Sequence, residues 1–457
     1  MDLLIENAMA IAVMDDDRRV LGDASVHISG DRIVAVGKDL SVEGAERIDA
    51  RGCVVIPGMV NTHHHLYQTM FRNVPGTQDV ELFPWLKTLY PIWRHITPED
   101  VHTSAQVGLG ELLLTGCTTS TDHFYLFPED QPNEIIDQTV EAARSLGIRF
   151  HPTRGSMSRG TSKGGLPPDT VVQDEATILR DCERFADAYH DPSEGAMCRV
   201  ALAPCSPFSV TPELMRDVAV LARERGLRLH THLAETLDEE RFCIRTTGMR
   251  PLAYMESVDW VGADVWYAHG VHFDDAEVVL LGSTGTGVAH CPGSNLRLGS
   301  GIARVPDLTA AGAPVGLAVD GSASNDASDM LAEARLALLV HRIGTGVTRM
   351  SAMDALWLAT RGGARVLGWD EVGSLEPGNQ ADLAMFRVDD LAHAGGLHDP
   401  VASLVFCGGR HNAEAVLVAG EVRVRKGRLV GVDEERLAAR QNERAAAVLR
   451  RAGRELP

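Results

Sequence analysis

The chain has 457 residues, of which 44% are hydrophobic, and its 63 acidic residues outnumber its 43 basic residues to give a formal net charge of −20. A surface this acidic disfavours the phosphate backbones of nucleic acids and anionic membranes, and it suits a protein that acts on a small molecule. The sequence has neither a leader pattern nor an apolar run of membrane-spanning length, so we expect a cytoplasmic protein with no membrane partner.

Residues 1–57 predict a small β unit. Three stretches alternate apolar and polar residues and are broken by Asp and Gly turns, as strands in a half-buried sheet do. These stretches are "DLLIENAMAIAV", "DASVHISGDRIVAVG" and "RIDARGCVVIPG".

From residue 58 onward, apolar runs alternate with helix-like stretches. Eight candidate strands precede residue 369, counting the one that leads into a run of histidines. Segments between them, such as "EIIDQTVEAARSLG" and "PELMRDVAVLARERG", have the period of amphipathic helices. Alternating strands and helices pack as a parallel sheet with the helices outside it. Residues 58–369 therefore predict a (β/α)8 barrel of the TIM type, in which active sites lie at the carboxyl ends of the strands.

Residues 370–432 return to short strands and Gly turns, in "VGSLEPGNQADLAMFRVDD" and "AVLVAGEVRVRKGRLVG". We predict that this segment pairs with residues 1–57 to form one small β-sandwich beside the barrel. Residues 433–457 are charged and rich in Ala, which predicts a terminal helix that packs or frays.

Three adjacent histidines, His63, His64 and His65, follow the first barrel strand in "GMVNTHHHLYQT". Side chains alternate along a strand, so His63 and His65 share one face and His64 takes the other. Two imidazoles on one face at a strand end can hold a metal ion between them. Residues of metal-binding type also end other candidate strands, namely His232 in "LHTHLAE" with Glu235 three residues on, His269 in "YAHGVH" and Asp320 in "LAVDGSAS".

Several motifs together make the chain resemble the amidohydrolase superfamily, in its branch of mononuclear-metal aminohydrolases that act on purines, pterins and triazines. They are "PGMVNTHHH", "HTHLAET", "YAHGVH", "HCPGSNLRLGSGIARV", "VDGSASNDASDM" and "VGSLEPGNQADL". Within the branch, "YQTMFRNVP", "ELFPWLKTLYPIW", "RGSMSRG" and "APCSPFSV" look most like 8-oxoguanine deaminases. The resemblance spans nearly the whole chain, and it implies hydrolytic deamination of 8-oxoguanine to urate and ammonia.

The resemblance implies that His63, His65, His232 and Asp320 are metal ligands. Imidazoles with one carboxylate suit a single divalent ion, Zn²⁺ first and Fe²⁺ as the alternative, and leave a position for water. Such a water ionises near pH ~7 instead of ~15.7. The resemblance also makes Asp320 the acceptor of that proton, His269 the group that steadies the developing oxyanion, and Glu235 the proton shuttle to a ring nitrogen and the departing amine.

Four further histidines have other interpretations. His64, on the opposite strand face, is interpreted as structural. His230 lies one layer deeper than the ligand two residues on, which favours a hydrogen-bonded core role. His290 is interpreted as a brace for the loop of Asp320. His123 ends the second strand, and a contact with substrate and a structural role both stay open.

Gln68, Trp93, Arg154 and Cys205 are the candidates for recognition of the ring. Gln68 can donate and accept along a purine edge, Arg154 can donate to a carbonyl, and Trp93 offers a face for stacking. The alternatives are a loop hydrogen bond for Gln68 and packing beneath the loop for Trp93. Cys205 stands where related adenosine-type deaminases often carry a histidine, and this favours a bare, flat base over a ribose-bearing substrate.

Three other functions stay open. The nearest is the same reaction on isoxanthopterin, guanine or an aminotriazine. A binuclear amidohydrolase would use a bridging carboxylated Lys or a Glu at a middle strand. The third and fourth strands end in "HPTRG" and "APCSP", with no Lys in place, which counts against a second metal ion. A non-catalytic purine-binding barrel would require lost ligands, and all of them are present. We expect a small heterocyclic substrate, no nucleic-acid partner and, from the resemblance, a homo-oligomer.

Overall fold

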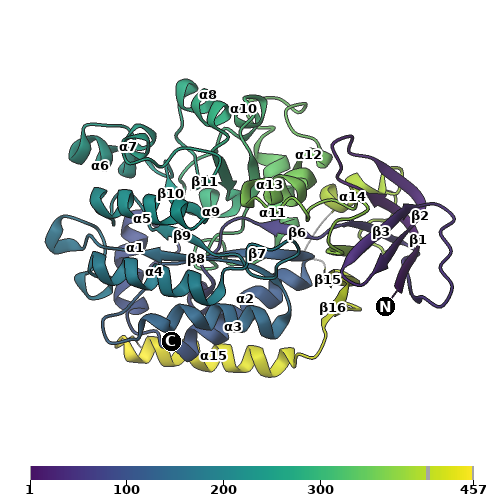
Figure 1. Cartoon of the computed structure of the whole chain (residues 1–457), viewed down its shortest axis with the longest axis horizontal. Helices are drawn as coiled ribbons and strands as arrows, with labels where there is room; N and C mark the ends of the chain where they lie inside the picture. Colours follow the sequence, from purple (N-terminus) through teal and green to yellow (C-terminus); the bar gives the residue numbers. More distant parts are fainter. Residues whose placement is uncertain (1, 408–411, 455–457) are drawn as a thin grey trace.

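Eight parallel strands form the centre of the chain, as the alternation of strands and helices predicts (Figure 1). The computed structural model describes residues 2–407 and 412–454. Strands that follow one another in the sequence are neighbours in the sheet, so every connection is a short crossover over its outside. The strands are β6 (Met59–Asn61), β7 (Cys117–Phe124), β8 (Arg149–Ser156), β9 (Ala201–Pro204), β10 (Arg228–Leu233), β11 (Val265–His269), β12 (Gly287–His290) and β13 (Val315–Leu317).

Hydrogen bonds between the two edge strands, β6 and β13, close the sheet into a barrel. The N–H of Thr62 donates to the carbonyl of Leu317 at 3.1 Å. Just beyond the ends of the two strands, the N–H of Asp320 donates to the carbonyl of His63, also at 3.1 Å. The predicted (β/α)8 barrel is confirmed. Its closure brings the first and last predicted metal ligands side by side, although they are far apart in the sequence.

Helices surround the barrel on its outside (Figure 1). Polar caps define where several of them begin: the side chain of Thr97 accepts from the N–H of Asp100, whose carboxylate accepts in return from the N–H of Thr97. In the ranges that the structure describes, no helix combines the length and the apolar composition needed to cross a lipid bilayer. The helices are α1 (Leu82–Trp93), α2 (Pro98–Leu114), α3 (Asp137–Leu146), α4 (Glu175–Tyr189), α5 (Pro212–Glu224), α6 (Leu237–Thr247), α7 (Pro251–Ser257), α8 (Asp275–Thr284), α9 (Pro292–Arg297), α10 (Val305–Ala310), α11 (Met330–Val340), α12 (Ala352–Trp357) and α13 (Gly363–Leu367).

Both ends of the chain contribute strands to a second sheet, as predicted for the small β unit. Strand β5 pairs antiparallel with β14, so that Pro57 lies opposite Leu383 and Cys53 opposite Arg387. The strands are hydrogen-bonded in one continuous series rather than as two separate sheets. They are β1 (Asp2–Ala12), β2 (Val20–Ser29), β3 (Arg32–Gly37), β4 (Glu46–Asp49), β5 (Cys53–Pro57), β14 (Leu383–Arg387), β15 (Ala415–Val418), β16 (Glu421–Arg425) and β17 (Arg428–Leu429), with the short helix α14 (Pro400–Phe406) after β14.

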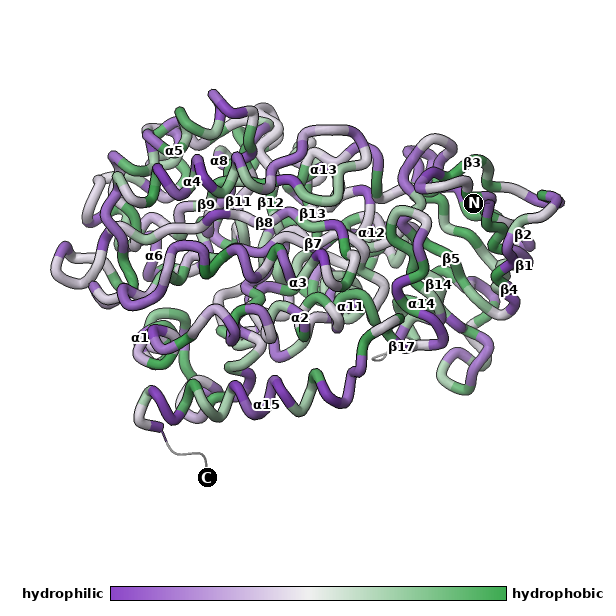
Figure 2. The backbone as a smooth tube through the Cα atoms, turned by 60° about the horizontal axis from the view of Figure 1, so that its bottom comes forward, coloured by the Kyte–Doolittle hydropathy of each residue, from purple (hydrophilic) through white to green (hydrophobic). Residues whose placement is uncertain are grey.

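The last helix, α15 (Glu434–Arg451), packs along the barrel beside α2 (Figure 1). It alternates purple and green along its length in Figure 2, as an amphipathic helix does. Its Arg444 donates to Asp100 at 2.7 Å, and Gln441 donates to the hydroxyl of Thr69 at 2.9 Å. The domain boundaries at 57, 370 and 433 stay predictions, and residues 1, 408–411 and 455–457 of those segments lie outside the described residues.

A buried ion pair joins the barrel to the terminal sheet. The guanidinium of Arg149, at the start of β8, donates through Nε and Nη2 to both carboxylate oxygens of Asp382 at 2.9 and 3.1 Å. The same carboxylate accepts the N–H of Ala419 at 2.7 Å. Both side chains are almost fully buried, and the bidentate geometry compensates part of the cost of removing two charges from water.

We predict that Arg149→Met lowers the free energy of unfolding by roughly 3–5 kcal/mol, because the substitution leaves the buried charge of Asp382 without a partner. Denaturant titration followed by circular dichroism measures this loss. Arg144→Met is the matched control, since Arg144 forms an exposed pair with Glu141 and such pairs contribute ~0.3–0.5 kcal/mol. Equal losses in the two variants would show that the buried pair does not hold the two sheets together.

Candidate active site

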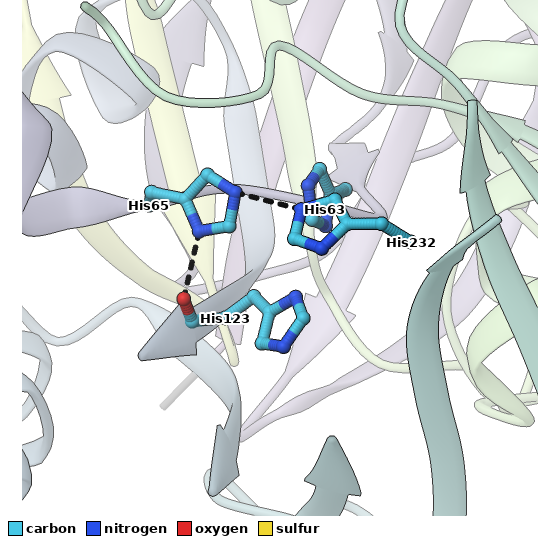
Figure 3. Close-up of side chains that lie close together, drawn as sticks. All are labelled: His63, His65, His123 and His232. Carbon is cyan, nitrogen blue, oxygen red and sulfur yellow. Dashed lines mark hydrogen bonds between the residues drawn. The ribbon is translucent and has the colours of Figure 1, made fainter. Parts of the chain in front are cut away.

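Four of the predicted metal ligands converge where the barrel strands end (Figure 3 shows three of them, with His123). His63 and His65 follow β6, His232 lies near the end of β10, and Asp320 follows β13. The Nε2 atoms of His65 and His232 are 3.0 Å apart. The Oδ1 atom of Asp320 lies 3.4 Å from Nε2 of His63 and 3.3 Å from Nε2 of His65.

Backbone carbonyls fix the protons of two of these imidazoles. The Nδ1–H of His65 donates to the carbonyl of His123 at 2.7 Å, as the dashed line in Figure 3 marks. The Nδ1–H of His232 donates to the carbonyl of Cys205 at 2.6 Å. A carbonyl can only accept, so each neutral ring has its lone pair on Nε2, the atom that faces the other ligands.

A second histidine fixes the proton of His63. The Nδ1–H of His230 donates to the carbonyl of Trp266 at 3.0 Å, so its Nε2 accepts from Nδ1 of His63 at 2.8 Å. The Nε2 of His63 is buried and has no hydrogen-bond partner among the described residues. Burial lowers the pKa of His63 well below its usual range and that of His230 to about 3, so both rings stay neutral. His230 thus takes the hydrogen-bonded core role expected of it.

A divalent cation fits this arrangement. Two Nε2 lone pairs at 3.0 Å repel each other unless a positive charge lies between them. The third lone pair, on His63, is equally unused, and the carboxylate of Asp320 adds the charge that a hard or borderline cation needs. Metal-binding atoms of His63, His65, His123 and His232, and those of His63, His269 and Asp320, lie within 4.8 Å of one another.

His123, whose role the sequence left open, belongs to the same cluster. Its Nε2–H donates to the carbonyl of Ala203 at 2.8 Å. Its ring stacks on that of His232, with the centroids 4.7 Å apart, and its carbonyl holds the proton of His65. These contacts make His123 a residue that orients two ligands.

Asp320 is held in place by its own neighbours. Ser294 and Ser324 donate their hydroxyls to Oδ2 at 2.5 and 3.1 Å, and the N–H of Gly321 donates to Oδ1 at 2.6 Å. The backbone of Asp320 has a φ of 62° and that of His269 a φ of 75°, and such left-handed non-glycine residues gather at functional sites.

Glu235 and His269 form the second part of the site. Oε2 of Glu235 lies 3.6 Å from Nε2 of His269, and the Nδ1–H of His269 donates to Oδ1 of Asn295 at 2.9 Å. Burial raises the pKa of Glu235. Burial would lower the pKa of His269, but the carboxylates of Glu235 and Asp320 raise it overall. Both shifts favour the protonated form of the side chain, next to the candidate metal position.

A cavity opens onto these residues. Gln68 and Cys205 line it, as predicted. The Oε1 atom of Gln68 is buried without a hydrogen-bond partner in the described part of the chain. Its aromatic walls, which the sequence analysis did not name, come from Trp85, Tyr90, Tyr125 and Phe208.

The structure brings neither Trp93 nor Arg154 to the lining of this cavity. Trp93 is fully buried and packs against the rings of Trp85 and Tyr90, which is the packing alternative. Arg154 donates to Asp181 at 2.8 Å, and its guanidinium lies 3.9 Å from the ring centroid of Phe127. These buried partners hold the donors that were expected to read a substrate carbonyl.

Two other histidines have structural partners. His64 points away from the cluster, and its Nε2 lies 3.0 Å from the hydroxyl of Ser328, which agrees with its structural interpretation. His290 has its Nε2 3.1 Å from Nε2 of His341. Its carbonyl accepts the N–H of Ala318 at 2.8 Å, two residues before Asp320, so the contact with that strand is made by the backbone.

We predict that His230→Phe weakens metal binding by roughly 10–100-fold, because it removes the acceptor that keeps the Nδ1 proton of His63 in place. Competition with a chelator of known affinity measures the change. His102→Phe, on the outer helix α2, is the control and should bind metal as the unsubstituted protein does. Unchanged affinity in His230→Phe would mean that the hydrogen bond does not orient His63.

Comparisons with known proteins agree with this geometry. Residues 54–423 match the family model described as "Amidohydrolase family". An 8-oxoguanine deaminase of Pseudomonas aeruginosa is 50% identical over 91% of this chain and 92% of its own length. An isoxanthopterin deaminase of an unknown prokaryotic organism is 38% identical over 98% of this chain and 97% of its own.

A solved structure gives the same result. The atrazine chlorohydrolase of Arthrobacter aurescens TC1, in complex with zinc, superposes with a TM-score of 0.93 at 37% identity, over 97% of this chain and 100% of that one. The family assignment rests on three findings: the similar fold, the matching family model, and the histidines that converge with Asp320. The chain belongs to the amidohydrolase family, and its barrel carries a site for a divalent metal ion.

Proposed function

We propose that the chain hydrolyses 8-oxoguanine to urate and ammonia with the help of one zinc ion. The observation that carries the proposal is the convergence of three imidazole lone pairs and the Asp320 carboxylate beside Glu235, at the base of an aromatic-walled cavity. The 50% identity to a protein named 8-oxoguanine deaminase supports this choice of substrate.

His63, His65, His232 and Asp320 would hold the ion. Three imidazoles and one carboxylate are a common donor set for Zn²⁺, and the zinc complex of the Arthrobacter aurescens relative supports zinc over iron. When bound, the ion supplies Lewis-acid chemistry that lowers the pKa of a water from ~15.7 to about 7.

The remaining steps are proton movements between side chains of this chain. Oδ1 of Asp320 takes a proton from the attacking water. Glu235, whose pKa is raised by burial, donates its proton to the ring nitrogen next to the carbon that carries the amino group, and this makes that carbon electrophilic. A carbon–oxygen bond forms, the carbon–nitrogen bond to the amino group breaks, and the proton held by Asp320 leaves with the amine as ammonia. The second proton of the added water returns to Glu235 as the new carbonyl forms, so both carboxyl groups regain their starting states.

His269 would stabilise the negative charge that develops during the attack. Its Nδ1–H is held by Asn295, so its Nε2 is the atom that faces Glu235. The raised pKa of His269 favours a proton on that atom. A preorganised N–H donor at this position stabilises an oxyanion more strongly than water does, because the buried site has a low dielectric constant.

Gln68 and Cys205 stay in the proposal as groups that read the ring. The unpartnered Oε1 of Gln68 suits a ring N–H. Burial raises the pKa of Cys205 to about 12, so its thiol is neutral, and it leaves the space that a larger residue would fill. Trp85 and Tyr90 replace Trp93 as the aromatic faces available for a flat base.

A second candidate is the same reaction on isoxanthopterin, which the identity of 38% over 98% of the chain to an isoxanthopterin deaminase supports. The exocyclic amine, the neighbouring ring nitrogen and the flat shape are shared by the two substrates, so the same side chains would act on both.

A cytoplasmic location and a homo-oligomeric assembly stay predictions.

Glu235→Gln should keep the metal and bind the substrate, yet lose at least roughly two orders of magnitude in kcat, because a positioned acid–base group contributes ~10²–10⁴-fold. Metal analysis and an ammonia-release assay on one preparation test both parts. Asp320→Asn is the contrasting variant, which should lose metal and activity together. Near-normal turnover by Glu235→Gln would remove this residue from the mechanism.

Substrate choice is tested by kcat/KM for 8-oxoguanine, guanine and isoxanthopterin on one preparation. We expect 8-oxoguanine to be preferred over guanine by up to about 10⁴, because a site built for the 8-oxo group and its adjacent N–H leaves buried polar groups unpaired when guanine binds. If guanine matches it, the site does not read position 8. If isoxanthopterin exceeds it, the second candidate is the substrate.

A further inference from the structure

A second cavity, of about 290 Å³, opens at the end of the barrel opposite the metal site. Arg228 is the first residue of β10, and Arg199 stands two residues before β9, so the cavity lies where strands begin. His151 of β8 and His190, which follows α4, complete its polar wall. It shares no lining residue with the cavity at the candidate active site.

The hydrogen bonds around Arg228 leave part of its guanidinium unused. Nη2 donates to the carbonyls of Ala263 and Val366 at 2.9 and 2.8 Å. Nη1 makes no hydrogen bond with the described residues, and Nε is buried without a partner there. Nη1 is therefore the nitrogen of Arg228 that has donors left for a ligand, while two carbonyls hold the position of the guanidinium.

Arg199, just before the neighbouring strand β9, is held by more partners than Arg228. Nη2 pairs with Glu371 at 2.5 Å and donates to the carbonyl of Ser193 at 3.1 Å, and Nη1 donates to the carbonyl of Gly368 at 3.2 Å. Its Nε is buried, and none of the residues in the described ranges accepts a hydrogen bond from it. Arg199 is thus fixed by three acceptors beside the cavity.

The two histidines add donors. Nδ1 of His190 accepts the N–H of Val200 at 3.0 Å, so the proton of the neutral ring is on Nε2. His151 is 1% exposed, and its Nδ1 has no partner in the part of the chain that the structure describes. Burial, with Arg228 and Arg199 adding to it, lowers the pKa of His151 well below its usual range, so its ring is neutral.

Arg228 has no carboxylate partner among the described residues, Arg199 is paired with Glu371, and none of the described residues that line the cavity is a carboxylate. A ligand that matches such a wall must accept hydrogen bonds and carry negative charge. We propose that this cavity binds a small phosphate-type oxyanion, held by Arg199, Arg228, His151 and His190. The site is independent of the proposed deaminase activity, because it has its own residues and needs no metal.

Titration of inorganic phosphate into the purified holoenzyme, followed by isothermal calorimetry, tests the proposal. We expect one site per chain, and Arg228→Met should weaken phosphate binding by at least about tenfold, as for the loss of a charged hydrogen-bond donor. Arg225→Met is the matched control, since it removes the same charge from an arginine that pairs with Asp187 outside the cavity. Its affinity should be unchanged.

Two further arms keep the result interpretable. Pro192 is an exposed residue of the cavity rim, so Pro192→Asp should repel the anion without disturbing the core, and it replaces Arg228→Met if that variant does not fold. Asp320→Asn should bind phosphate as the unsubstituted protein does. The proposal is overturned if the unsubstituted protein does not bind phosphate. It is also overturned if Arg228→Met and Pro192→Asp bind phosphate as tightly as the unsubstituted protein, or if Asp320→Asn loses phosphate binding.

Methyl phosphate distinguishes the two sources of the same ligand chemistry. Affinity equal to or above that of inorganic phosphate assigns the cavity to the phosphate group of a phosphomonoester. Weaker binding assigns it to the free ion. In both cases Arg228→Met and Pro192→Asp should lower the affinity for methyl phosphate as they lower the affinity for inorganic phosphate. An affinity for methyl phosphate that neither substitution changes would also count against the site.

Discussion

Each imidazole at the candidate metal site has one proton, and the fold takes that proton away from the centre. His65 and His232 give theirs to backbone carbonyls, and His63 gives its own to His230. The lone pairs that remain face one another at the candidate metal position. Without this arrangement, a ring could turn its N–H toward the centre and donate a hydrogen bond to a neighbouring imidazole, which would use up the lone pair that a metal ion needs.

The barrel meets this requirement by using its strand ends as fixed anchors. His65, after β6, donates its hydrogen bond to the carbonyl of His123 near the end of the adjacent strand β7. His232, on β10, donates to the carbonyl of Cys205, directly after the adjacent strand β9. The closing hydrogen bond from Asp320 to the carbonyl of His63 fixes the carboxylate relative to the same cluster. The left-handed backbone at His269 and Asp320 is tolerated because the surrounding contacts over-determine both residues.

Local pattern was enough to predict the parts of the site that depend on a single strand. The alternation of side chains assigned His63 and His65 to one face and His64 to the other, and the same alternation placed His230 one layer below His232. The barrel followed from the order of strands and helices. Arg154 depends instead on a contact with a distant segment, since Asp181 lies 27 residues away in the sequence. Trp93 shares the helix α1 with Trp85 and Tyr90, and the way this helix packs on the barrel turns those two rings, rather than Trp93, toward the cavity. No periodicity in the sequence reveals such a choice of partner.

The pairing of β5 with β14 has a consequence for biosynthesis. The chain leaves the ribosome from its amino terminus, so β5 is made long before the strand that lies beside it. Until then the amino-terminal strands have an open edge, and the barrel must be completed as an insertion between two halves of one sheet. The helix α15 follows the strands of both sheets in the sequence and reaches back to Thr69, four residues after His65. The segment that carries the first two ligands therefore gains this outer support only after the strands of both sheets have been made.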